Sequence, residues 1–465
     1  MKKLKLEDIQ GFVLRQYLLP AVRHFLLKVN NPAAARKALG RLVTGNEKDS
    51  PQITTAANGA VTPPYCLQIG ITYPGLIELE LKERVGKFSF KSFPAFVQGA
   101  AERAATVGDH GANGPEHWID GFGRGDDHVL VTLYAANPRI RESQSPRLAE
   151  VFAAGGAFAE LWRGDGDALI EKVNGQTTPV PKVHFGYVDG IAQPTIMGAP
   201  EPSVPDRQQP CPPWLFVLLD EGENYCVPDP PELGRNGSFG VFKRIRQDVA
   251  GFENFLQSNK DKIDPELLAA KICGRWRNGV PLALSPDTDS PLGGIRVEKL
   301  NDFEYVEKGG AGDPAGLKCP VGSHIRRMNP RGQPVRGQGI AGGSNNTHRI
   351  VRRGMPYGPM FDPIAPDDGI ERGLMAYFIN TKIENQYEFA LREWAHNYEF
   401  VGATRLHPKA KDVILGTQGE NVFEIARAGE PPMQVAGFAS FIRTEAAAYC
   451  FLPSITALKF IAGLR

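Results

Sequence analysis

The sequence predicts an α+β fold divided into two domains. The chain has 465 residues, more than one hydrophobic core usually organises, and its 42% hydrophobic and 23% charged residues are typical of a globular protein. Patterns typical of strands and of helices alternate on both sides of residues 199–213, where six of fifteen residues are proline. Because proline is excluded from helix interiors and central strands, this segment predicts a domain boundary. We therefore expect domains formed by residues 1–205 and 206–465.

Three helices follow from apolar spacing and capping residues. Apolar side chains recur at near-helical spacing between residues 9 and 18, which predicts an amphipathic helix at the start of the chain. Asn31-Pro32 precedes an alanine-rich run and predicts a capped helix over residues 33–39. In the second half, a helix is expected over residues 248–256.

Strands are expected where apolar runs lie between turn-forming residues. These runs cover residues 66–73, 128–135, 183–188, 214–219 and 238–242. The glycine-rich residues 108–127 predict a loop, and Asn236-Gly237 predicts a turn. Because the two halves share this alternation, we expect an α+β architecture repeated twice, although no repeat is visible residue by residue.

Charge and cysteine content exclude several classes of protein. Lysine plus arginine (53) nearly balances aspartate plus glutamate (52), so the chain has no broad basic field for nucleic acid or an anionic membrane. The six cysteines lack the spacing of zinc or redox sites and predict reduced thiols. Glu7 and Asp8 follow the N-terminal lysines at once, which fits neither a signal peptide nor a membrane span. We expect a cytoplasmic protein without nucleic-acid or membrane partners.

Residues 337–342 match the glycine pattern of dinucleotide-binding loops. That pattern requires a strand before it and a helix after it. Here residues 329–334 are typical of a loop and residues 347–351 are typical of a strand. We therefore interpret the glycines as a flexible connector.

His324 is distinguished by its neighbours, because Arg326, Arg327 and Arg331 follow it closely. An imidazole is a common axial ligand of haem iron, and guanidinium groups match the carboxylates of haem propionates. A surface histidine in a basic loop would explain the same pattern. Cys319 is a rival ligand through its thiolate, but a cysteine before proline is more often simply buried.

Asp189 and Arg352 are further candidates that the residues alone leave open. Asp189 precedes Gly190, and such a pair most often forms a turn. Arg352 and Arg353 could form a solvated basic edge. Considered one at a time, each candidate has a simpler structural explanation.

Considered together and in this order, these segments resemble the dye-decolorising peroxidases, specifically their longer-chain bacterial and fungal-like branch. Residues 185–194 (FGYVDGIAQP) look like the distal-aspartate signature of the family. Residues 319–331 look like its proximal-histidine signature, and residues 348–358 like its distal-arginine segment. Further similarity covers residues 68–76, 229–248 and 383–389, so the resemblance spans most of the chain.

The resemblance implies one haem b per chain, with His324 as the iron ligand. Arg326 and Arg331 are expected among the cofactor-binding residues because they lie close to His324 in sequence. It also implies Asp189 as the distal acid and base, with Arg352 as its partner. Arg353 is rejected because the matching arginine directly follows an aliphatic pair. Glu384 looks like the acceptor of the other ring proton of His324. Glu388 lies one helical turn away and is left open as an alternative.

The implied fold is two ferredoxin-like domains, each an antiparallel sheet with helices, with the haem mainly in the second domain. The implied activity is reduction of hydrogen peroxide with oxidation of dyes, phenolics and other organic reductants, in a protein that forms dimers or larger assemblies. A haem carrier or sensor, or a related enzyme acting on chlorite or removing haem iron, is the alternative. Because a free carboxylate has a pKa near ~4, we expect an acidic optimum.

Bulky dyes cannot enter a pocket sized for peroxide, so electrons are expected to reach the haem through aromatic side chains. Tyr357 is the leading candidate, followed by Trp394 and Tyr377. Core packing is the alternative role for each ring.

Overall fold

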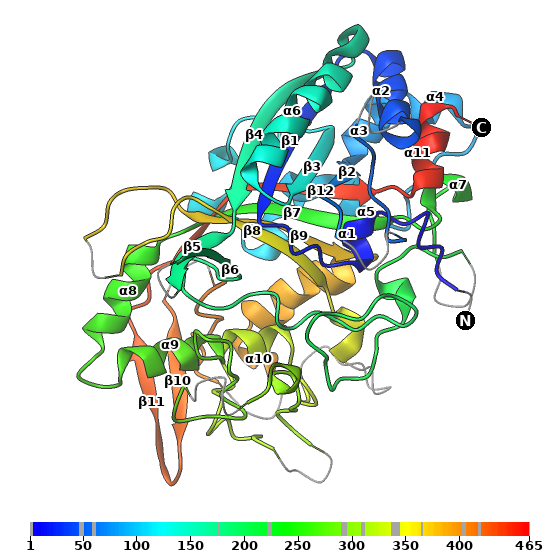
Figure 1. Cartoon of the computed structure of the whole chain (residues 1–465). Coiled ribbons are helices and arrows are strands. Elements are labelled where there is room, and N and C mark those ends of the chain that lie inside the picture. Colours follow the sequence, from blue (N-terminus) through cyan, green and yellow to red (C-terminus); the bar gives the residue numbers. More distant parts are fainter. Residues whose placement is uncertain are drawn as a thin grey trace.

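The protein was analysed as a computed structural model (Figure 1). It describes residues 3–45, 51–57, 62–173, 176–220, 226–289, 295–307, 312–335, 345–363, 366–401, 406–416 and 420–464. The glycine pattern of residues 337–342 lies outside these ranges. Within them, no helix is both long enough and apolar enough to cross a membrane.

In the described part of the chain, eight strands form one antiparallel sheet in the order β4-β1-β3-β2-β12-β7-β9-β8. The first four in sequence are β1 (Ala21–Val29), β2 (Tyr65–Ile71), β3 (Val129–Ala135) and β4 (Phe158–Asp167). The other four are β7 (Ser238–Gln247), β8 (Val351–Tyr357), β9 (Gly373–Asn380) and β12 (Ile442–Leu452). Each set of four has the spatial order fourth, first, third, second, which is that of a ferredoxin-like domain. The predicted α+β fold with two ferredoxin-like units is confirmed.

Helices cover and connect these strands (Figure 1). The α-helices are α1 (Gly11–Leu14), α2 (Pro32–Thr44), α3 (Tyr73–Glu78), α4 (Leu81–Arg84), α5 (Pro94–Arg103), α6 (Pro138–Ala153), α7 (Pro231–Gly234), α8 (Val249–Ser258), α9 (Pro265–Cys273), α10 (His324–Met328) and α11 (Ile455–Ala462). Two π-helical segments are η9 (Glu384–Glu388) and η10 (Ala390–Ala395). The 3-10 turns are η1 (Ala104–Val107), η2 (Gly111–Asn113), η3 (Pro115–His117), η4 (Ala154–Gly156), η5 (Pro213–Leu215), η6 (Val297–Lys299), η8 (Asn345–His348) and η11 (Tyr398–Phe400). Separate hairpins are formed by β5 (Leu169–Val173) with β6 (Gln176–Val180) and by β10 (Val422–Arg427) with β11 (Glu430–Ala436).

The two halves share one hydrophobic core. The ring of Phe242, on β7, lies 5.0 Å from His24 of β1 and stacks on Phe122 at 5.7 Å. Strands β2 and β12 meet at the pair Ile71 and Phe451. The predicted boundary between residues 205 and 206 lies in the segment between the two sets of strands, and division of the chain there stays a prediction.

Several predicted elements are confirmed, and their ends follow from the residues at their caps. The side chain of Asn31 accepts a hydrogen bond from the amide of Ala34 at the start of α2, at 3.2 Å. Asp248 accepts one from Gly251 at the start of α8, at 2.8 Å. The strands expected over residues 66–73, 128–135 and 238–242 are β2, β3 and the first half of β7.

Three predicted elements are wrong. The opening helix is limited to Gly11–Leu14, because the chain then becomes extended and the Tyr17 ring packs against Gly11. Residues 183–188 form a turn instead of a strand, since Gly186 has a φ of +88°. Residues 214–219 begin within the 3-10 turn η5 (Pro213–Leu215) and form no strand, because prolines at 212 and 213 prevent regular strand pairing.

Candidate functional site

His324 is the first residue of α10, and its ring is held by a buried carboxylate. The ring nitrogen Nδ1 lies 2.9 Å from Oδ2 of Asp412, whose side chain is completely buried. The other oxygen of Asp412 accepts hydrogen bonds from the amides of Ile414 at 2.8 Å and Leu415 at 2.9 Å. The imidazole itself is 26% exposed, so its orientation is fixed while part of the ring remains accessible.

The charge of Asp412 determines which ring nitrogen of His324 is free. Burial alone would raise the pKa of Asp412, but His324, the Leu415 amide and Arg327 outweigh burial and hold that pKa below its usual range. An ionised carboxylate is only an acceptor, so it requires the proton of His324 on Nδ1. The lone pair on Nε2 is then available for a metal, which is the donor set that suits haem iron.

The predicted contact between Glu384 and His324 is wrong. The carboxylate of Glu384 accepts a hydrogen bond from the amide of Ala95 at 2.7 Å, at the start of α5. The alternative, Glu388, also faces away: it accepts hydrogen bonds from Nε of Arg103 at 2.9 Å and from the hydroxyl of Tyr449 at 3.1 Å. Both carboxylates lie in the π-helical segment η9, and each has a partner in the first half of the chain, Ala95 or Arg103. Asp412 was missed because it lies 88 residues beyond His324.

Arg326 and Arg331, which were predicted to bind haem, both have protein partners, and their role toward haem stays a prediction. Arg326 is completely buried and donates to the carbonyl of Asp313 at 2.8 Å and to the side chain of Gln333 at 2.6 Å. Arg331 is 2% exposed and donates to Oδ1 of Asp206 at 2.9 Å. Both guanidinium groups therefore bind protein groups and connect the histidine segment to its surroundings.

The ion pair of Asp206 with Arg331 gives a prediction about acid stability. Burial alone would raise the pKa of Asp206, but Arg331 and Arg349 outweigh it and hold the pKa below its usual range. Asp206→Asn is expected to lower the free energy of unfolding at neutral pH by about 3–5 kcal/mol, because it leaves Arg331 buried and unpaired. The contribution of the carboxylate is complete above the unfolded-state pKa of about 4 and is lost as pH falls through the lower folded-state pKa.

Urea unfolding of both proteins between about pH 3 and pH 7 tests this prediction. The difference in unfolding free energy between wild type and variant must shrink toward the acidic end. A difference that stays constant over this range would contradict the role given to Asp206.

The loop that carries Asp189 contacts the strand that carries Arg352. The amide of Asp189 donates to the carbonyl of Pro181 at 2.8 Å, and the turn continues through Gly190, leaving the carboxylate exposed. On β8, Nη2 of Arg352 donates to the carbonyl of Ala192 at 2.5 Å, in the same loop. Burial lowers the pKa of Arg352, and the negative charge of Asp189 partly restores it. The pair therefore combines a proton acceptor with a cation.

The side chain of Gln193 forms two hydrogen bonds with the backbone of Arg352. Its side-chain oxygen accepts from the Arg352 amide at 3.1 Å, and its nitrogen donates to the Arg352 carbonyl at 3.1 Å. Arg353 is the next residue on β8, so its side chain leaves the opposite face, where Nε donates to the carbonyl of Phe12 at 2.8 Å. The choice of Arg352 over Arg353 agrees with this alternation.

A buried amide connects the aspartate loop to the histidine segment. The nitrogen of the Asn301 side chain donates to the carbonyl of Ile191 at 2.9 Å, two residues after Asp189. Its oxygen accepts from Arg275 at 2.8 Å, and its own carbonyl accepts from Arg331 at 3.1 Å. The two sides of the candidate site therefore share one hydrogen-bonded framework.

The three aromatic candidates are all buried. The Tyr357 hydroxyl donates to Glu445 at 2.9 Å, and the Arg244 guanidinium lies 4.2 Å from the ring centre. Trp394 packs edge-on to His348 at 5.4 Å. Tyr377 lies in the shared core, 5.4 Å from the Phe242 ring. A role of these rings in electron transfer stays a prediction.

Comparison with known proteins gives relatives along almost the whole chain, although no family model matches it. The chain is 29% identical to a dye-decolorizing peroxidase of Mycena epipterygia over 448 residues, 89% of this chain and 80% of that protein. It is 26% identical to the dye-decolorizing peroxidase msp1 of Mycetinis scorodonius, over 98% and 88% of the two chains. A multifunctional dye peroxidase of the bacterium Amycolatopsis is 28% identical over 86% of this chain and 82% of its own.

Solved structures agree with the sequence relatives. An ancestral D-type dye decolorizing peroxidase has a TM-score of 0.82 at 25% identity, covering 98% of this chain and 99% of its own. A fungal peroxidase of this type from Auricularia auricula-judae has the same fold, with a TM-score of 0.82 at 22% identity over 99% and 100% of the chains. The fold is thus that of two-domain ferredoxin-like peroxidases. In sequence and in fold the chain is similar to the dye-decolorizing peroxidases, the family that its motifs resemble.

Proposed function

We propose that this protein is a haem b peroxidase, with one haem per chain seated mainly in the second domain. Its substrates would be hydrogen peroxide and a reducing organic compound such as a dye or a phenolic. The observation that supports this most directly is the placement of Asp189 and Arg352 on one loop and strand, connected through Asn301 to the segment of His324.

His324 would hold the iron through Nε2, because Asp412 occupies Nδ1. When bound, haem supplies an iron centre that accepts oxygen and stores oxidising equivalents. A buried carboxylate on Nδ1 gives the imidazole anionic character and strengthens it as a ligand. This arrangement favours oxidation chemistry over reversible oxygen binding.

Asp189 would move the proton that peroxide cleavage requires. One oxygen of hydrogen peroxide must lose a proton and the other must gain one before the O–O bond breaks to release water. The exposed carboxylate of Asp189 can accept that proton and return it, directly or through one water. The guanidinium of Arg352, held by Ala192 and Gln193, would stabilise the negative charge that develops on the leaving oxygen.

Peroxide-dependent oxidation of a dye and a phenol by the purified haem-loaded protein tests the proposal. The haem absorption spectrum is recorded before and after addition of one equivalent of peroxide per haem. We expect that single equivalent to change the spectrum. Oxidation at the level of free haem would instead favour a carrier or sensor. Assays of chlorite turnover and of haem iron loss on the same preparation separate the remaining alternatives.

Asp412→Asn is expected to weaken haem binding by about 10–100-fold, because the imidazole loses the carboxylate that orients it. The matched control is Glu384→Gln, which keeps an acceptor for the Ala95 amide and should leave haem binding unchanged. The rate of haem transfer to an excess of a competing haem-binding protein measures both. Equal rates for the two variants would contradict the role of Asp412.

Tyr357→Phe is expected to slow the oxidation of a bulky dye severalfold while leaving the reaction with peroxide unchanged. The hydroxyl of Tyr357 donates to Glu445, which can accept its proton when the ring loses an electron. Tyr377→Phe is the comparison, since that ring lies in the shared core. Steady-state dye oxidation and stopped-flow reaction with peroxide separate the two steps. The relay is refuted if both variants oxidise the dye at the wild-type rate.

The cytoplasmic location and the formation of dimers or larger assemblies stay predictions. Cell fractionation tests the first, and light scattering on the purified protein tests the second.

A further inference from the structure

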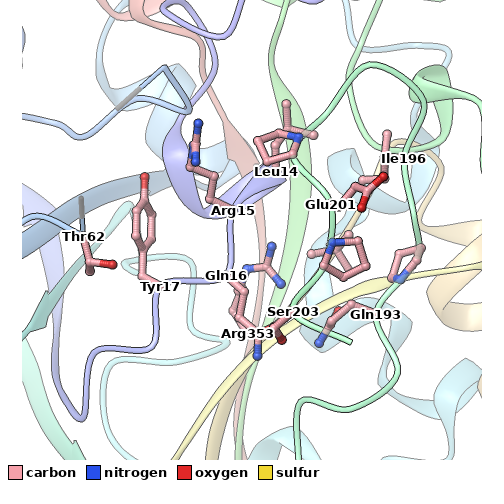
Figure 2. Close-up of a pocket in the computed structure, with 14 residues that line it drawn as sticks. Leu14, Arg15, Gln16, Tyr17, Thr62, Gln193, Ile196, Glu201, Ser203 and Arg353 are labelled. Carbon is pink, nitrogen blue, oxygen red and sulfur yellow. The ribbon is translucent and has the colours of Figure 1, made fainter. Parts of the chain in front are cut away.

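A cavity of about 230 Å³ lies on the face of β8 opposite to Arg352 (Figure 2). Its walls come from four parts of the chain: residues 14–17 at the end of α1 and just after it, Thr62, residues 193–203 after the aspartate turn, and β8 itself. Val351 and Arg353 line it, as the alternation of the strand requires. The catalytic role proposed for Asp189, Arg352 and His324 does not use this cavity.

Two guanidinium groups line the cavity, and neither forms an ion pair within the described residues. Arg353 donates through Nε to the Phe12 carbonyl at 2.8 Å and through Nη1 to the Arg352 carbonyl at 2.9 Å. Arg15 donates through Nε to the carbonyl of Ala56 at 2.5 Å. Backbone oxygens thus hold both cations in place. Each guanidinium group keeps further N–H groups that can donate to a ligand.

The surroundings of Arg353 favour a negatively charged ligand. Burial lowers the pKa of Arg353 to about 10, and the nearby groups that counteract this are the tyrosines at 134 and 17, not carboxylates. A partly buried cation without a counter-ion is costly, and an anion would remove that cost. Arginine forks match the two oxygens of a carboxylate.

The remaining walls limit the size and charge of the ligand. Leu14, Ile196 and the prolines at 194, 200 and 202 form apolar surface, and the Tyr17 ring adds an aromatic face. Glu201 also lines the cavity, so two guanidinium groups and one carboxylate leave one positive charge. A ligand with one negative charge and a small flat ring therefore complements these walls better than a multiply charged anion.

We propose that this cavity binds a small aromatic monocarboxylate, with its carboxylate on Arg353 and Arg15 and its ring against Tyr17 and the prolines. Gln193 also lines the cavity, and both Gln193 and Arg353 contact the backbone of Arg352. A ligand bound here would therefore touch the residues that position Arg352. Binding itself does not depend on the proposed peroxidase activity.

Titration calorimetry of the haem-loaded full chain with benzoate tests the proposal. We expect saturable binding without a change in the haem absorption spectrum, which separates this cavity from the iron. Benzamide, which has the same shape without charge, should bind about tenfold more weakly or worse. Inorganic phosphate should not compete.

Substitutions of cavity residues are expected to change the affinity for benzoate in opposite directions. Arg353→Gln should weaken benzoate about tenfold or more, whereas Glu201→Gln should strengthen it about two- to fivefold. Arg124→Gln is the matched control, because Arg124 is exposed and pairs with Asp120 elsewhere on the surface. Arg15→Gln replaces Arg353→Gln if the latter fails to fold, as judged by circular dichroism.

Three results would overturn the proposal. Benzoate affinity could be the same in the folded arginine variant as in the wild type. Benzamide could bind as tightly as benzoate, or phosphate could compete with it, which would make the cavity an unspecific apolar or anion site.

Discussion

His324→Ala is expected to abolish stable haem binding, reducing the haem content to the background of a non-binding protein. The imidazole of His324, the first residue of α10, is the group that the proposed site offers to the iron. Asp412 would keep its buried charge but would lose its hydrogen-bond partner. Haem content after gel filtration, from the absorption spectrum and the iron-to-protein ratio, measures the effect.

His117→Ala is the matched control for this variant, because the side chain of His117 is 57% exposed and lies in the turn η3. It should bind haem like the wild type. A normal ferric spectrum at full occupancy in His324→Ala would refute the ligand assignment.

Asp189→Asn is expected to keep its haem and to react with peroxide about 10²–10⁴-fold more slowly. The amide has the size of the carboxylate and can keep the turn, but it cannot take up and return a proton. Arg352 would remain in place through Ala192 and Gln193. Stopped-flow absorption after mixing with peroxide measures the rate of this step.

Asp120→Asn serves as the control, since the Asp120 side chain is 88% exposed and pairs with Arg124. It should react at the wild-type rate. An unchanged rate in Asp189→Asn would transfer the proton-moving role to Arg352 or to water.

The helices and strands that could be predicted from the sequence are those marked by residues within or next to the element itself. The cap of Asn31 on α2 and the apolar runs of β2 and β3 depend on neighbouring residues, so they are visible in the sequence. Strand β1 was not predicted, because Arg23 and His24 interrupt its apolar pattern. The structure buries both: Arg23 pairs with Asp165, 142 residues away, and His24 contacts Thr132 at 2.9 Å. Partners at that distance in sequence leave no local pattern.

In the candidate site too, residues that lie in a sequence motif could be predicted, and residues that act through contacts distant in sequence could not. Asp189 and Arg352 were predicted as a pair from their motifs, and in the structure Arg352 donates a hydrogen bond to Ala192 of the Asp189 loop. Asp412 carries no motif and acquires its role only through a contact across 88 residues. Arg326 was assigned to haem because it lies near His324 in sequence, but a helix turns it into the interior, where Asp313 and Gln333 use its donors. Nearness in sequence does not determine which way a side chain faces.

The position of β12 in the sheet has a consequence for synthesis of the chain. This strand, Ile442–Leu452, pairs with β2 of the first half and with β7 of the second, so it joins the two units (Figure 1). When the ribosome has made residues 21–167, the edge of β2 still lacks this neighbour, and it must wait for nearly three hundred further residues. An open strand edge invites pairing with other chains. The nascent first half therefore exposes a strand edge that β12 covers in the complete chain.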